Sequence, residues 1–147
     1  MTELLAAIEA LAVAEHLRVS RWTYPVVNGL HILGLALLYG AVVPLDLRLL
    51  GLWKTVGIAD LSRVLVPVGA AGLAVTLATG LLLFATQAAH YASMTLFWAK
   101  MALVALALAN AGAAILMPAR LPRSALAALS ILCWTGAIFA GRFLGFA

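Results

Sequence analysis

The sequence predicts an all-α membrane protein, a polytopic four-helix up-down bundle preceded by an amphipathic helix at the membrane surface. Hydrophobic residues make up 66% of the chain, charged residues only 10%, and the mean hydropathy is +1.14. A soluble domain averages roughly 25% charged residues, whereas a surface that faces lipid needs none. The hydrophobic residues also fall into four long runs. With 147 residues, we expect one membrane domain over 1–147.

Each of the four hydrophobic runs has the length of a membrane span. They cover about 25–45, 61–88, 96–117 and 124–143, close to the ~20 residues that cross about 30 Å of hydrocarbon. Pro44 and Pro118 mark the predicted ends of the first and third spans. The connections are short, so sequence neighbours should be antiparallel.

Residues 2–18 form a shorter and more polar segment before the first span. Its hydrophobic residues recur at helical spacing, but Glu9, His16 and Arg18 interrupt them. This pattern predicts a helix that lies along the interface and does not cross the membrane.

The charge distribution indicates a multi-pass membrane protein. The net charge is +4 and the pI about 9.9, yet the basic residues lie singly at the edges of the hydrophobic runs, which favours the lipid bilayer over nucleic acid as the partner. The loops after the first and third spans hold more basic residues than the opposite side, which places both termini outside. These loop residues are Arg48, Lys54, Arg63, Arg120 and Arg123.

Small residues share one face of two spans. Gly69, Gly72, Thr76 and Gly80 lie together on the second span, and a second set lies on the fourth. That second set is Ser130, Ala137 and Gly141. Lipid provides no hydrophobic drive for helix association, so close backbone approach at small residues should supply it.

Polar residues inside spans are the candidate functional groups, because they are costly in a membrane. His31 lies roughly 9 Å into the first span, with Asn28 one turn earlier on the same face. Lys100 enters the third span from the same side, and Arg142 lies near the end of the fourth span on that side. We interpret Asp46 as a helix cap or surface charge.

All three histidines are predicted at this end of the bundle. His90 and Met94 lie in the loop that closes it, and His16 lies on the interfacial helix above it. Two chemistries fit. Haem b needs axial nitrogen ligands and apolar walls, from His31 with His90 or Lys100, while basic residues pair with its propionates. Copper instead favours imidazole and thioether ligands, from His90 and Met94 with His31 or His16.

Several stretches resemble a known family. They are Trp22-Thr-Tyr-Pro-Val-Val-Asn-Gly-Leu-His31, Leu45-Asp-Leu-Arg-Leu-Leu-Gly51, Thr79-Gly-Leu-Leu-Leu-Phe84, Phe97-Trp-Ala-Lys100 and Gly141-Arg142. Together they resemble, over nearly the whole chain, a bacterial four-helix inner-membrane family of unknown function. That family is distantly similar to the copper-resistance D-type proteins and to the J-type protoporphyrinogen oxidase, which is associated with haem b.

The resemblance places His31 and Lys100 at the histidine of an early span and the lysine of a later one. The sequence differs from the J-type pattern at Pro44-Leu-Asp-Leu-Arg48, near the end of the first span. It differs again around Asn110, where that pattern has a later helical histidine. We therefore expect a small b-haem-binding membrane redox protein with a membrane or periplasmic redox partner. A copper-handling protein and a non-catalytic subunit of a larger complex are the alternatives, and a homo-oligomer stays open.

Overall fold

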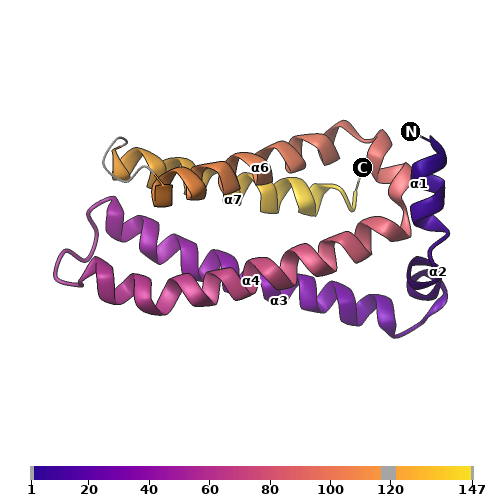
Figure 1. Ribbon diagram of the computed structural model, residues 1–147, viewed down its shortest axis with the longest axis horizontal. Helices are drawn as coiled ribbons and strands as arrows, with labels where there is room; N and C mark the ends of the chain where they lie inside the picture. The colour runs from indigo at the N-terminus through magenta and orange to yellow at the C-terminus, as the bar shows by residue number, and fades with distance from the viewer. Residues whose placement is uncertain (1, 117–121, 147) are drawn as a thin grey trace.

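The computed structural model, which describes residues 2–116 and 122–146, confirms the all-α class. Four helices in this range are long and apolar enough to cross a membrane, so the chain is a multi-pass membrane protein. They lie side by side (Figure 1) and are α3 (Thr23–Leu49), α4 (Ile58–Thr86), α6 (Thr95–Leu116) and α7 (Arg123–Phe143). The predicted stop at Pro118 and the basic residue Arg120 lie outside the described residues.

The first span is longer than its sequence pattern predicts. It continues through Pro44 to Leu49, which makes it about 40 Å long at 1.5 Å per residue. Pro44 has no N–H to donate to the carbonyl of Gly40, but one missing hydrogen bond does not end a helix that packs along most of its length. The charged residues Asp46 and Arg48 therefore belong to α3.

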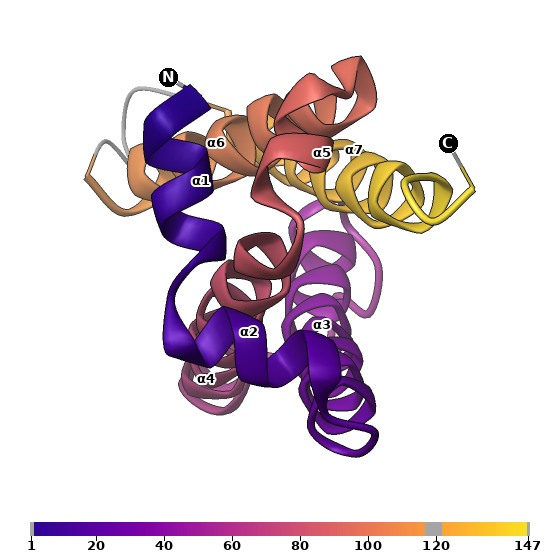
Figure 2. The same ribbon diagram turned by 90° about the vertical axis from the view of Figure 1, so that its right-hand side faces the viewer.

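The N-terminal segment forms two helices, where one was expected. These are α1 (Thr2–Glu9) and α2 (Ala12–Val19), separated at Leu11, whose backbone is extended. They lie across one end of the bundle with α5 (Ala88–Ser93), as Figure 2 shows. The Glu9 carboxylate accepts a hydrogen bond from the Ala89 amide at 2.8 Å. We call this end, which holds both N-terminal helices, the α1–α2 end.

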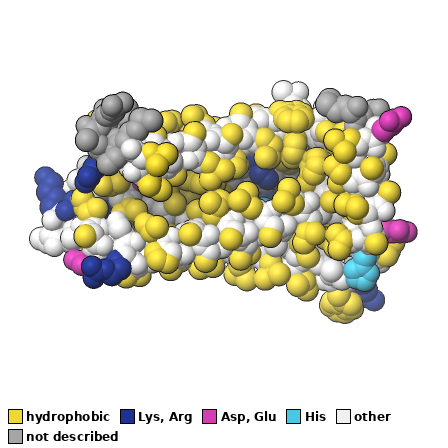
Figure 3. All heavy atoms as spheres, in the orientation of Figure 1, with side chains coloured by type: hydrophobic (Ala, Val, Ile, Leu, Met, Phe, Trp, Pro, Cys, Tyr) yellow, Lys and Arg dark blue, Asp and Glu magenta, His cyan; other side chains and the backbone are white. Residues whose placement is uncertain are grey.

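The bundle consists of two antiparallel hairpins, α3–α4 and α6–α7, joined through α3 and α7. Tyr39 of α3 and Thr135 of α7 share a hydrogen bond of 2.9 Å at this junction. Over the described residues, the backbones of α4 and α6 do not approach each other closely, but Phe84 of α4 stacks on Phe97 of α6 with ring centroids 5.2 Å apart. Figure 3 views this side and shows a hollow between the upper and lower rows of helices. The hairpins therefore pack closely at α3 and α7, while α4 and α6 are wider apart and are bridged by the Phe84 and Phe97 rings.

The α3–α4 hairpin is held by direct backbone contact at two glycines. A Cβ atom added to Gly72 would lie 2.5 Å from the Leu38 amide nitrogen and 2.8 Å from the Gly34 carbonyl oxygen. A Cβ atom on Gly34 would lie 2.9 Å from the Thr76 amide nitrogen. The predicted small-residue face of the second span is confirmed, because its residues pack against α3.

Replacing Gly72 with alanine should therefore destabilise the bundle. The added methyl group would collide with backbone atoms, and overpacking costs about 1–3 kcal/mol, more than the roughly 1 kcal/mol that alanine gains over glycine as a helix former. Gly112→Ala on α6 is the matched control, since nothing lies within 4 Å of its added Cβ. Thermal unfolding in detergent should show a lower midpoint for Gly72→Ala and an unchanged or higher one for Gly112→Ala. Equal midpoints would mean that Gly72 faces lipid.

Candidate functional site

His31 is held in one orientation by a hydrogen bond across the α3–α4 hairpin. Its half-buried ring places Nδ1 2.9 Å from the Oγ1 atom of Thr79, which is buried. The Thr79 hydroxyl donates its own proton to the Val75 carbonyl at 2.6 Å. A hydroxyl has one proton, so Thr79 must accept from His31, and Nδ1 carries the imidazole hydrogen. Nε2 then keeps its lone pair and is available to bind a ligand.

The glycine at position 80 leaves room for this ring. A Cβ atom added there would lie 3.1 Å from the His31 Cε1 atom. The close approach at Gly34 and Gly72 brings α3 and α4 near enough for this contact. The small-residue face thus both packs the hairpin and positions the imidazole.

Lys100 approaches the same region from the other hairpin. Its half-buried side chain lies across α7, where a Cβ added to Gly141 would be 3.4 Å from Cε and 3.5 Å from Nζ. Its charge acts through space on the His31 imidazole, although the backbones of α3 and α6 do not approach each other closely over the described residues. His31 and Lys100 are therefore the two predicted residues that the structure brings to one region.

His90 and Met94 lie closer to the α1–α2 end than His31 does. From Thr79, the partner of His31, α4 continues to Thr86, a rise of about 10 Å, and α5 follows. His90 is exposed on α5 with its ring against Tyr91, centroids 6.0 Å apart. Met94 is the half-buried C-cap residue of α5. Over the described residues, the backbone of α5 does not approach that of α3 closely, so these two residues are not placed beside His31.

The remaining predicted site residues are exposed. His16 shares a 3.3 Å hydrogen bond with Thr23, and the Arg142 guanidinium lies over the Phe146 ring at 4.7 Å. Asn28 is exposed although it was expected beside His31. In the part of the chain that the structure describes, no three His, Cys, Asp or Glu side chains are grouped as they would be around a metal ion.

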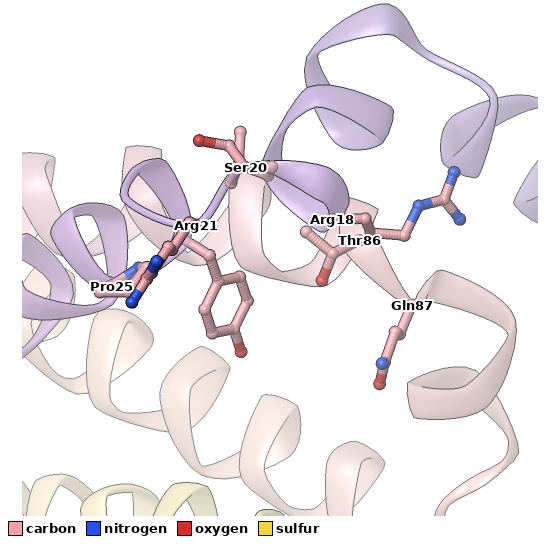
Figure 4. Close-up of a pocket in the computed structure, with 8 residues that line it drawn as sticks. Arg18, Ser20, Arg21, Pro25, Thr86 and Gln87 are labelled. Atoms are coloured by element: carbon pink, nitrogen blue, oxygen red, sulfur yellow. The ribbon is translucent and has the colours of Figure 1, made fainter.

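A pocket of about 380 Å³ lies at the α1–α2 end, between the start of α3 and the end of α4. In Figure 4, Arg21 lies beside Pro25, and the side chain of Gln87 extends from the other wall. Arg18 also lines the pocket but donates to the Glu9 carbonyl at 2.8 Å. On α5, burial and the nearby Tyr24 raise the pKa of Tyr91.

Two polar residues that sequence reasoning misjudged are buried in the bundle. Asp46, interpreted as a cap or surface charge, is only 7% exposed, because α3 extends past Pro44 and carries Asp46 against α7. Thr79 was not singled out at all. The sequence signal that could have identified Thr79 as a partner in helix packing is its place one residue before Gly80, beside the small-residue face.

Comparison of the chain with protein-family models, with curated proteins and with solved structures found no match. The functional interpretation therefore rests on the geometry of the site.

The His31–Thr79 hydrogen bond predicts a single imidazole tautomer. Nitrogen NMR of histidine-labelled protein should show His31 protonated at Nδ1 and bare at Nε2. Thr79→Val removes the acceptor and should produce a mixture of tautomers. Thr86→Val is the matched control, because the Thr86 hydroxyl is also buried but bonds only to the Leu83 carbonyl of its own helix. A wild-type His31 protonated at Nε2 would contradict this geometry.

Proposed function

We propose that the protein is a b-haem-binding membrane redox protein in which Nε2 of His31 is an axial ligand of the iron. The observation that supports this proposal is the hydrogen bond from Nδ1 to Thr79. Metal-binding histidines almost always donate their second ring N–H to an oxygen, which fixes the tautomer and the ring direction. His31 meets this requirement before any ligand binds.

The surroundings of His31 also suit a large flat cofactor. The backbones of α4 and α6 do not approach each other closely, a hollow lies between them (Figure 3), and both helices are strongly apolar. The stacked Phe84 and Phe97 rings bridge the two helices and would form one apolar wall. A haem needs such apolar walls and one or two axial ligands. Lys100, on the facing hairpin, would act either as the second ligand or as the cation for a propionate.

Bound haem would supply one-electron transfer, and the chain's own residues would set where that transfer takes place. His31 and Lys100 both lie in the half of the bundle nearer the α1–α2 end. Electrons would therefore exchange with a partner that approaches this end, from the periplasm or within the membrane. The copper alternative that uses His31 needs His90 and Met94 beside it, and the positions of those two residues on α5 do not provide this.

The proposal predicts a Soret band that depends on His31. Protein made with an adequate haem supply should be coloured, and His31→Ala should abolish the band while the chain still inserts and folds, because the spans are unchanged. His90→Ala is the matched control: it also removes a histidine, but an exposed one on α5, and should keep the band. Thermal unfolding of each variant checks the fold.

Variants of Lys100 separate its two roles. Lys100→Ala should change the position of the Soret band if the amine binds iron, and should mainly weaken haem retention if it pairs with a propionate. Lys100→Arg keeps the charge and should restore retention only in the second case. A colourless wild-type protein under full haem supply would contradict the proposal.

A further inference from the structure

A second polar cluster lies toward the opposite end of the bundle from His31. Asp46 follows His31 on α3 by about 22 Å along the helix axis. Its side chain is 7% exposed, and those of Asn110 on α6 and Ser130 on α7 are each 8% exposed. Ionisable groups buried in membrane spans are functional candidates by default, because burial without a purpose is costly.

The three side chains meet along one strip of α7. Ser130 on α7 lies by the Asp46 carboxyl. The Asn110 amide Nδ2 donates to the Leu126 carbonyl at 3.0 Å. Leu126 and Ser130 are four residues apart and so lie on the same face of the helix. Asp46 and Asn110 therefore approach α7 one helical turn apart.

The cluster has more acceptor oxygens than donors. Within the described residues, Oδ2 of Asp46 and Oδ1 of Asn110 are both fully buried and have no hydrogen-bond partner. Both are acceptors, as is the Leu126 carbonyl that Asn110 contacts. A buried carboxylate with no positive partner is expensive, and what would relieve this cluster is a positive charge or a proton.

None of the charged side chains described on the packed helices supplies that charge. Arg48 on α3 donates to the carbonyls of Val56 and Lys54 at 2.7 and 3.2 Å, toward the α3–α4 loop. Two other titratable groups in this half are not exposed: the buried thiol of Cys133 and the half-buried phenol of Tyr39, which bonds to Thr135. The exposed ones are Lys54 in the α3–α4 loop, Asp60 and Arg63 on α4, and Arg123 on α7.

A pocket of about 260 Å³ lies beside the cluster, lined by residues from all four spans. Leu45 precedes Asp46, and the Leu126 carbonyl is the partner of Asn110. Ser62 and the exposed Arg123 also line the pocket, at the end of the bundle where basic side chains gather (Figure 3). The pocket thus reaches chain neighbours of the cluster from that end, although Asp46, Asn110 and Ser130 do not line it.

We propose that Asp46, Asn110 and Ser130 form a site for a small monovalent cation, a proton or Na⁺, that enters from this basic end. The carboxylate supplies the charge, and the amide and hydroxyl oxygens complete an all-oxygen donor set of the kind that hard cations prefer. This site is independent of His31 and of any haem.

Infrared spectroscopy of the protein in detergent tests the site directly, because protonated and ionised carboxyl groups absorb at different frequencies. In Na⁺-free potassium buffer near neutral pH, the wild type should show a protonated carboxyl band. Asp46→Asn should remove the band, while Asp60→Asn, which changes an exposed aspartate, should keep it. Loss of the band at alkaline pH identifies a proton site, and saturable loss on adding Na⁺ but not K⁺ identifies a sodium site.

Asn110→Leu provides a second variant that leaves Asp46 in place. It should shift the pH midpoint or the apparent Na⁺ affinity by roughly tenfold or more, as expected when a charged group loses one polar partner. Two outcomes would overturn the proposal: a carboxylate ionised at every pH with or without Na⁺, or a carboxyl that stays protonated to alkaline pH and ignores Na⁺. The first would mean that an existing group already balances Asp46, and the second that the carboxyl is a fixed structural one.

Discussion

Gly34 and Gly72 bring the backbones of α3 and α4 into direct contact, and the rest of the architecture depends on this approach. A single methyl group at either position would meet backbone atoms within 3 Å. In lipid, where burying apolar side chains offers helices little advantage, such close packing is a main source of association. The close packing of α3 and α4 also sets the orientation of the His31 imidazole. At this helix separation His31 reaches Thr79 while its ring lies against Gly80.

The second hairpin is attached more loosely. It joins the first through α3 and α7, where Tyr39 bonds to Thr135 and Ser130 lies by Asp46. The wider spacing of α4 and α6, which the stacked Phe84 and Phe97 rings bridge, follows from this one-sided attachment. The result is a bundle with two polar levels, His31 with Lys100 toward the α1–α2 end and Asp46 with Asn110 toward the other. The first level offers a nitrogen lone pair, and the second offers only oxygens.

The sequence predicted the features that depend on periodicity along a helix. Four hydrophobic runs became four spans, and the small-residue face of the second span packs as expected. The sequence also predicted how far along each span a residue lies, so His31 and Lys100 were correctly placed in the same half of the bundle. The sequence did not predict which way α3 turns its polar residues after Pro44, because the burial of Asp46 depends on where α7 docks. It also did not predict the break at Leu11, or that α5 would hold His90 away from α3, because short helices at the ends of a bundle are positioned by tertiary contacts.

Cysteine cross-linking within the α3–α4 hairpin tests the central claim most directly. A Cβ atom at position 69 would lie 3.3 Å from the Ala41 Cβ, close to the roughly 3.5–4.5 Å that a disulfide spans. In a Cys133→Ala background, Ala41→Cys with Gly69→Cys should form an intramolecular disulfide when membranes are treated with a lipid-soluble oxidant. The Ala41→Cys and Gly112→Cys pair should not form one, since the added Cβ at 112 has no neighbour within 4 Å. A cross-link that appears only between two chains, as a covalent dimer, would contradict the account, because the small-residue face would then join copies of the protein rather than α3 to α4.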